Sequence, residues 1–148
     1  MNVQKIHDYQ HSVTLDQVEA AMLEFPQVDC PVSHHFGPGI YIREVVFPAG
    51  IFVIGHAHKA EHTCVMPKGK MAIISGGDAS VIEGPMIFTG QPGRKLAYVM
   101  EETVFQNIYA TDETDVEKLE DMFIEKSPAW LERHMLATHR DELLRVAS

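Results

Sequence analysis

Three histidines, His56, His58 and His62, lie close together in the middle of this 148-residue chain. Neutral imidazole is the most common metal ligand in proteins, and three imidazoles suit Zn, Fe, Ni, Cu or Co better than Mn or Mg. The three residue numbers have the same parity, and side chains of one parity share one face of a β-strand. If the chain reverses near Lys59 and Ala60, the three rings can converge on one ion. The spacing therefore predicts a metal site with neutral protein ligands.

The residues beside the histidines predict a cavity. Side chains of one parity on two successive strands would face each other if the strands pair antiparallel; they are Phe52, Ile54, His56 and His58, then His62, Cys64 and Met66. Apolar side chains would then fill the deep end, and the imidazoles would surround the mouth. Concave, mostly apolar pockets with a few convergent polar groups are the usual form of small-molecule sites. We therefore expect a small-molecule ligand.

The sequence leaves two interpretations open for each of three polar residues near the histidines. Cys64 is either a small buried hydrophobe, the commoner case, or a group that touches the site. Glu61 has the opposite parity and is expected to point outward, unless a bulge makes it a base or a ligand. Gln106 is either a polar group inside the barrel or an exposed residue on the other face. The pair His34 and His35 is expected in a solvated loop.

Composition excludes some classes of function. The formal net charge is −9, from 12 basic and 21 acidic residues. Proteins that bind nucleic-acid backbones need a basic surface, so we expect no nucleic-acid partner. No apolar run is long enough to cross a bilayer, and the N-terminus shows no apolar signal region. With two cysteines, Cys30 and Cys64, the reducing cytoplasm is the expected location.

The chain is expected to form one domain over residues 1–148. Helical periodicity predicts a helix at 14–25, which Thr14 would cap. Residues 39–111 alternate short β-rich runs with glycine, proline and aspartate, which is typical of a sandwich or barrel. Two helices are expected after the barrel, at about 114–124 and 128–146.

Several local boundaries follow from turn and cap residues. Residues 26–38, rich in proline, serine and glycine, are expected to form a loop. Turns are expected at 67–70 (PKGK), at Gly76-Gly77 and at 101–103 (EET). Thr114 is the expected cap of the first C-terminal helix, and Ser127 with Pro128 opens the second. Three strand tyrosines, Tyr41, Tyr98 and Tyr109, are expected in the core or an interface.

The histidine cluster resembles a known motif. The stretch Gly50-(x)5-His56-x-His58-(x)3-His62-(x)6-Gly69 is similar to the first conserved motif of the cupin superfamily, G-(x)5-H-x-H-(x)3–4-E-(x)6-G, with His62 in the position of the glutamate. The resemblance covers roughly residues 39–111. It implies a mainly β fold, a double-stranded β-helix or jelly-roll barrel, with the predicted helices at its ends. It also implies that His56, His58 and His62 are metal ligands.

The second cupin motif is matched less closely. That motif normally supplies a fourth ligand in the pattern P-x-G-x-x-H-x-x-x-N, and the matching stretch here runs from residue 90 to Asn107. Lys95 occupies the place of the histidine, and Arg94 is the next candidate. Arginine stays protonated and lysine usually does, so neither is a normal metal ligand.

Three interpretations of this departure stay open. The metal has three protein ligands and open positions for water or substrate, as catalytic sites often do. Alternatively, Lys95 or Arg94 points into the barrel and binds a carboxylate or phosphate beside the metal. In the third interpretation the metal site has degenerated, and the barrel binds an organic ligand or nothing.

The resemblance implies a metal-binding small cupin with a divalent transition metal, Zn, Fe, Ni, Cu, Co or Mn. As an enzyme it would act on a small anionic substrate bearing a carboxylate or phosphate, but the fold alone assigns no reaction. The alternative is a non-catalytic accessory or sensor cupin that binds a ligand or metal, similar to small cupin-like proteins of tailed phages and bacteria. Small cupins resemble dimers, so a homodimer is expected.

Overall fold

The computed structural model describes residues 15–75 and 78–148, which divide into two compact units. One unit is Val28–Glu125 and contains all the strands. The other consists of the described residues of Met1–Gln27 together with Lys126–Ser148. Thr14 and the Gly76-Gly77 pair lie outside the described residues, so the cap and the turn expected there stay predictions. Within the described ranges, no helix has the length and apolar character needed to cross a membrane.

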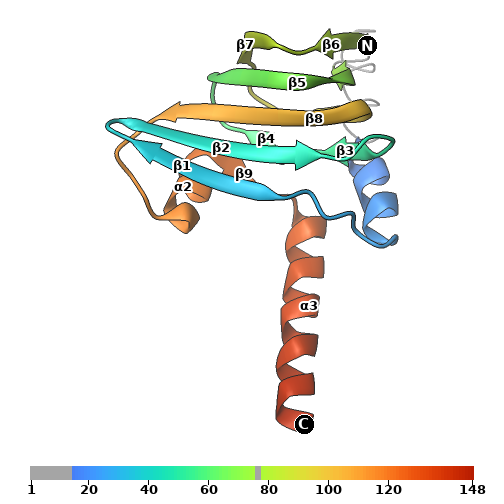
Figure 1. Cartoon of the computed structure of the whole chain (residues 1–148). Helices are drawn as coiled ribbons and strands as arrows, with labels where there is room; N and C mark the ends of the chain where they lie inside the picture. The colour runs from blue at the N-terminus through green and yellow to red at the C-terminus, as the bar shows by residue number, and fades with distance from the viewer. Residues whose placement is uncertain (1–14, 76–77) are drawn as a thin grey trace, which may run out of the picture. The chain divides into compact units, whose positions relative to one another are not determined.

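The β-rich unit is built on one seven-stranded antiparallel sheet (Figure 1). Its main path runs through β1 (Val32–Gly37), β2 (Ile40–Phe47), β8 (Leu96–Ala110), β5 (His62–Ser75) and β6 (Asp78–Glu83). Two further strands pair off this path, β3 (Phe52–Ile54) with β8 and β7 (Met86–Gly90) with β5. A separate two-stranded sheet joins β4 (Ala57–His58) to β9 (Ile124–Glu125). The predicted mainly β fold with flanking helices is confirmed.

The segment 26–38 is not a loop throughout, because Val32–Gly37 forms β1 and pairs with β2. A tight turn at Pro38 and Gly39 joins the two strands, and Gly39 has the positive φ of +69° that such turns require. The prediction failed because local composition is loop-like while pairing with a neighbouring strand decides the structure. His34 and His35 consequently lie on a strand.

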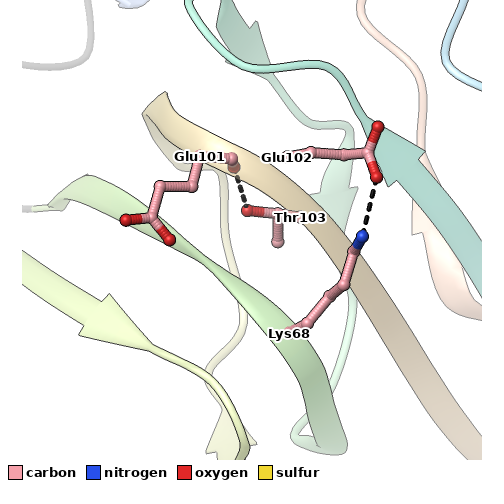
Figure 2. A network of polar contacts seen from close by, with 4 residues as sticks. All are labelled: Lys68, Glu101, Glu102 and Thr103. Atoms are coloured by element: carbon pink, nitrogen blue, oxygen red, sulfur yellow. Dashed lines mark hydrogen bonds and ion pairs between the residues drawn. The ribbon is translucent and has the colours of Figure 1, made fainter.

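The turns expected at 67–70 and 101–103 are instead irregular central parts of two long strands. The register between β5 and β8 shifts three times between Val65 and Met71, which marks bulges rather than a chain reversal. Figure 2 shows this region, where Lys68 forms a 2.8 Å ion pair with Glu102 and the buried Thr103 donates to the Glu101 carbonyl. Glycine and charged residues that suit turns also suit bulges, so the sequence pattern did not separate the two.

The apolar core lies on the inner face of the long strands and is centred on Met66, Met71, Ala97 and Val99. Cys64 and Met66 face inward, as their parity predicts. The parity prediction for the preceding strand is wrong, since Phe52 is 57% exposed and packs on Tyr98. The neighbouring Val53 packs against the core instead, because β3 places it opposite the buried Ala97.

Three helices occur among the described residues: one over residues 15–23, α2 (Val116–Phe123) and α3 (Pro128–Ala147). Ser127 caps α3 by accepting from the Trp130 N–H, as predicted. The cap of α2 is Asp115 rather than Thr114. Its carboxylate accepts from the Glu117 and Lys118 N–H groups, and a carboxylate there is also favoured by the helix dipole.

Candidate functional site

Polar side chains form a row across the inner face of the sheet. Successive register partners place His34 of β1 beside Arg43 of β2, Arg43 beside Asn107 of β8, and Asn107 beside Cys64 of β5. Directly paired residues on one face have Cβ atoms about 5 Å apart, so these four side chains are neighbours. The antiparallel pairing of four strands thus brings together groups that are far apart in the sequence.

An aromatic row lies next to the polar one. Tyr41 stacks on Phe36 and on Tyr109, with ring centroids 5.3 and 6.0 Å apart. Tyr109 also stacks on Phe123 of α2 at 4.1 Å and on His62 at 5.1 Å. This packing holds the Tyr109 ring between the helix and the histidines. α2 therefore contributes to the site by fixing an aromatic ring.

His58 and His62 lie side by side, although they are on strands that do not pair with each other. His62 begins β5 and is buried, whereas β4 carries His58 and pairs with β9, opposite Ile124. The Lys59 N–H donates to the Phe123 carbonyl and extends this pairing. The two imidazole rings stack with centroids 4.3 Å apart. Two of the three predicted histidines thus converge.

Each of these rings has its Nδ1 next to a protein oxygen. Nδ1 of His62 lies 3.2 Å from the Ala60 carbonyl oxygen, which can only accept, so this contact is a hydrogen bond when Nδ1 carries the proton. Nδ1 of His58 lies 3.1 Å from the Tyr109 hydroxyl. Nε2 of His62 lies 3.0 Å from Oδ1 of the buried Asn107. The partners of Nδ1 fix both ring orientations.

The surroundings favour neutral His58. Burial, together with the positive charges of His62, Lys95, Arg43 and His56, lowers the pKa of His58 to about 4. Burial also raises the pKa of Tyr109 above its ordinary value. At neutral pH the site therefore presents an uncharged imidazole beside an uncharged phenol. The same effects show that Lys95 and Arg43 act on His58.

Cys64 is an inward-facing thiol in this site. It is 2% exposed, and its Sγ lies 3.7 Å from Oδ1 of Asn107. Burial raises the pKa of the Cys64 thiol to about 11. Gly90 provides the space for this arrangement, since a Cβ there would lie 2.7 Å from Cys64 Sγ and 2.8 Å from His62 Nε2.

The two cysteines should react with thiol reagents at clearly different rates. Cys64 is buried, whereas Cys30 is only partly buried. A disulfide reagent at pH 8 should modify one thiol of the native protein rapidly, and the second only at a rate at least about tenfold slower, set by opening of the structure. The Cys30→Ser variant should lose the fast phase. A fast phase that survives this substitution would contradict the placement of Cys64.

The other predicted site residues are distributed around this centre. Lys95 acts on the pKa of both His58 and Cys64, and its Nζ donates to the Gln91 carbonyl. Arg94 donates from Nε to the Gly55 carbonyl. Gln106 donates to Glu44 at 2.6 Å, on the face of β8 opposite Asn107. Glu61 is exposed, next to the buried His62.

Two structural observations bear on the predicted metal site. Within residues 15–75 and 78–148, no three side chains of histidine, cysteine, aspartate or glutamate are arranged to hold an ion. His56 lies outside the strands and acts on the pKa of His58 only weakly, as the last of five causes. The pair His58 and His62 nevertheless fits a metal, because metal-bound histidines usually have their second nitrogen held by a carbonyl or similar group. This feature is present in both rings.

Asn107, Tyr109 and Arg43 were not among the residues predicted for the site. Asn107 ends the stretch that resembles the second cupin motif, and its parity differs from that of Gln106, which was considered instead. Tyr109 has the same parity as Asn107 and was expected in the core. No local pattern points to Arg43, because its place beside Asn107 depends on pairing between β2 and β8.

Comparisons with known proteins found similar structures but no sequence relative. No family model matches the chain, and no curated protein matches it. The cupin-2 domain of an XRE family transcriptional regulator from Enterobacter cloacae is 12% identical over 57% of this chain and 98% of its own, with a TM-score of 0.45. A cupin domain from Bordetella pertussis is 14% identical over 59% of this chain and 98% of its own, also at 0.45.

A cupin-2 domain protein from Shewanella frigidimarina is 10% identical over 63% of this chain and 91% of its own, with a TM-score of 0.43. At these identities the likeness concerns the fold alone.

Proposed function

We propose that the protein is a metal-binding cupin whose site is centred on Nε2 of His58 and His62. The supporting observation is that Nδ1 of each ring lies beside a protein oxygen, the Tyr109 hydroxyl or the Ala60 carbonyl. With Nδ1 protonated, each Nε2 carries a lone pair. A divalent transition metal is the ligand that two such adjacent, neutral imidazoles suit. His56 is the proposed third ligand, in keeping with the motif.

Asn107 adds an oxygen to this donor set. When His62 donates from Nδ1 to Ala60, both Nε2 of His62 and Oδ1 of Asn107 are acceptors, and they lie 3.0 Å apart. Two facing acceptors repel unless the amide turns its nitrogen toward the ring or a cation binds both. Ligand atoms lie about 2.1 Å from a bound transition ion, so two of them can share one ion at this separation. Asn107 thus supports the proposal of a cation at this position.

We propose a small anionic ligand beside the metal. Neutral ligands leave an ion its full charge, which favours bound anions or acidified water. Lys95 adds a positive charge close enough to affect His58 and Cys64. When bound, the metal would supply Lewis-acid polarisation of an oxygen atom. The chain's own residues would orient the anion and fix the rings.

Metal content of tag-free protein tests this proposal. Elemental analysis should find close to one transition ion per chain in the wild type. The variant His56→Ala/His58→Ala/His62→Ala should contain less than about a tenth of that amount, since it loses every imidazole of the site. His134→Ala/His139→Ala, which removes two exposed histidines of α3, is the matched control and should keep the metal. Equal metal content in all three proteins would refute the proposal.

A second candidate is a non-catalytic binding protein that holds an organic ligand without metal. The contact between His62 Nε2 and the Asn107 amide favours it, because that contact satisfies the nitrogen without an ion if the amide turns. A metal-free protein that binds a small anion would support this candidate. The homodimer and the cytoplasmic location expected from the sequence stay predictions, and sedimentation at two protein concentrations would check the first.

A further inference from the structure

Arg43 is a half-buried cation on the inner face of the β-rich unit. On β2 it has the parity of Tyr41 and Val45, which are both buried. Its register partners are His34 on one side and Asn107 on the other. The guanidinium therefore lies in the polar row, one strand away from the amide that contacts His62.

The effects of Arg43 on its neighbours agree with this position. Its charge acts on the pKa of four groups of the site: His34, Tyr41, His58 and Tyr109. These effects agree with its register position between His34 and Asn107.

Arg43 also has no protein partner for its guanidinium among residues 15–75 and 78–148. The ion pair between the exposed Lys68 and Glu102 does not involve Arg43. Tyr41 hydroxyl, a possible acceptor nearby, instead lies 2.7 Å from His34 Nδ1. A guanidinium has five N–H donors in a planar fork, and here the described protein groups accept from none of them. An inward-facing fork that is left to the solvent is suited to an anionic ligand.

We propose that Arg43 is the carboxylate receptor of the site, and that the ligand is a small carboxylic acid held between Arg43 and the pair His58 and His62. The fork of arginine matches the two oxygens of a carboxylate. This inference rests on the anionic ligand of the proposed function, but it does not require the metal. It also replaces Arg94 with Arg43 as the arginine of the site, since Arg94 donates to the Gly55 carbonyl.

A carboxylate fits better than a phosphate for a reason of charge. The Asn107 amide and two tyrosines beside this place are uncharged at pH 7, and Glu120 adds a negative charge that acts on His34 and Tyr41. Transfer of a dianion into such surroundings costs more than transfer of a monoanion. One guanidinium balances the single charge of a carboxylate.

The experiment titrates ¹⁵N-labelled protein with propionate, the neutral analogue propionamide and inorganic phosphate, and follows the Nε–H signal of Arg43 by NMR. The Arg43→Gln variant identifies this signal by its absence. Propionate should shift the signal saturably, while propionamide should not. Backbone signals of β2 and β8 should report propionate binding that is about tenfold or more weaker in Arg43→Lys, which keeps the charge but loses the fork.

Two controls make the outcome decisive. Arg94→Gln should bind propionate as the wild type does, and Arg43→Gln should keep the wild-type metal content. Propionate binding that is unchanged in Arg43→Gln, or no binding at all, would overturn the inference, as would tighter binding of phosphate. Carboxylate binding that depends on Arg43 in a protein without metal would uphold this inference while refuting the metal proposal.

Discussion

Replacing Gly69 by alanine should lower the free energy of unfolding by about 3 kcal/mol or more. Gly69 has a φ of +114°, which strains any residue with a side chain. A Cβ there would also lie 2.2 Å from Thr103 Oγ1 and 2.5 Å from Thr103 Cα. Thr103 is fully buried, and its backbone is part of β8, so it has no room to move. Urea unfolding followed by circular dichroism measures the loss.

Gly50→Ala is the matched control for this prediction. Gly50 also has a positive φ, +83°, but a Cβ there would meet no atom within 4 Å. Gly50→Ala should therefore lower the free energy of unfolding by the backbone strain alone, about 1 kcal/mol. If the two substitutions cost the same, the contact between Gly69 and Thr103 does not constrain the bulge. Both glycines belong to the cupin-like motif, and this pair of variants separates their two roles.

Gly90→Ala should weaken metal binding by about 10- to 100-fold in a protein that still folds. The new methyl group would overlap Cε1 and Nε2 of His62 and Sγ of Cys64, all within 2.8 Å. The flexible end of a side chain can yield, so His62 would turn away from Asn107 and from His58. Zn²⁺ affinity, measured by competition with a chromophoric chelator, and the unfolding free energy together check this result.

The control for this second substitution is Gly55→Ala, on the segment just before the histidines. A Cβ at Gly55 would meet nothing within 4 Å, and its φ is not in the positive range. Zn²⁺ affinity should therefore stay within about twofold of the wild type. An undiminished affinity in Gly90→Ala would mean that the position of His62 beside Asn107 is not needed for binding.

Much of the fold could be predicted from the sequence because its signals are local. The strand Ile40–Phe47, the inward parity of Cys64 and Met66, and the Ser127 cap depend on alternation or on a single hydrogen bond. The same local rules failed where two structures share one composition. Turn residues such as those at 67–70 are equally suited to a bulge, and only pairing with β8 decides between them.

The candidate site was predicted only in part, for a reason of topology. His58 and His62 are close in sequence, so spacing alone could bring them together. Asn107, Tyr109 and Arg43 join them through the pairing of β2, β8 and β5, which no single segment encodes. The pairing of β4 with β9 was also not predicted, and it separates the strand of His58 from that of His62. Long-range pairing thus decided which polar groups face the histidines.

The most direct test of the proposed site is the state of each ring nitrogen of His58 and His62. Long-range ¹H–¹⁵N NMR spectra of the imidazoles, recorded before and after one equivalent of Zn²⁺, report which nitrogen is protonated and which binds metal. The site proposed here predicts protonated Nδ1 in both rings throughout, and a large shift of both Nε2 signals when Zn²⁺ is added. Coordination through Nδ1, or spectra that Zn²⁺ leaves unchanged, would contradict it.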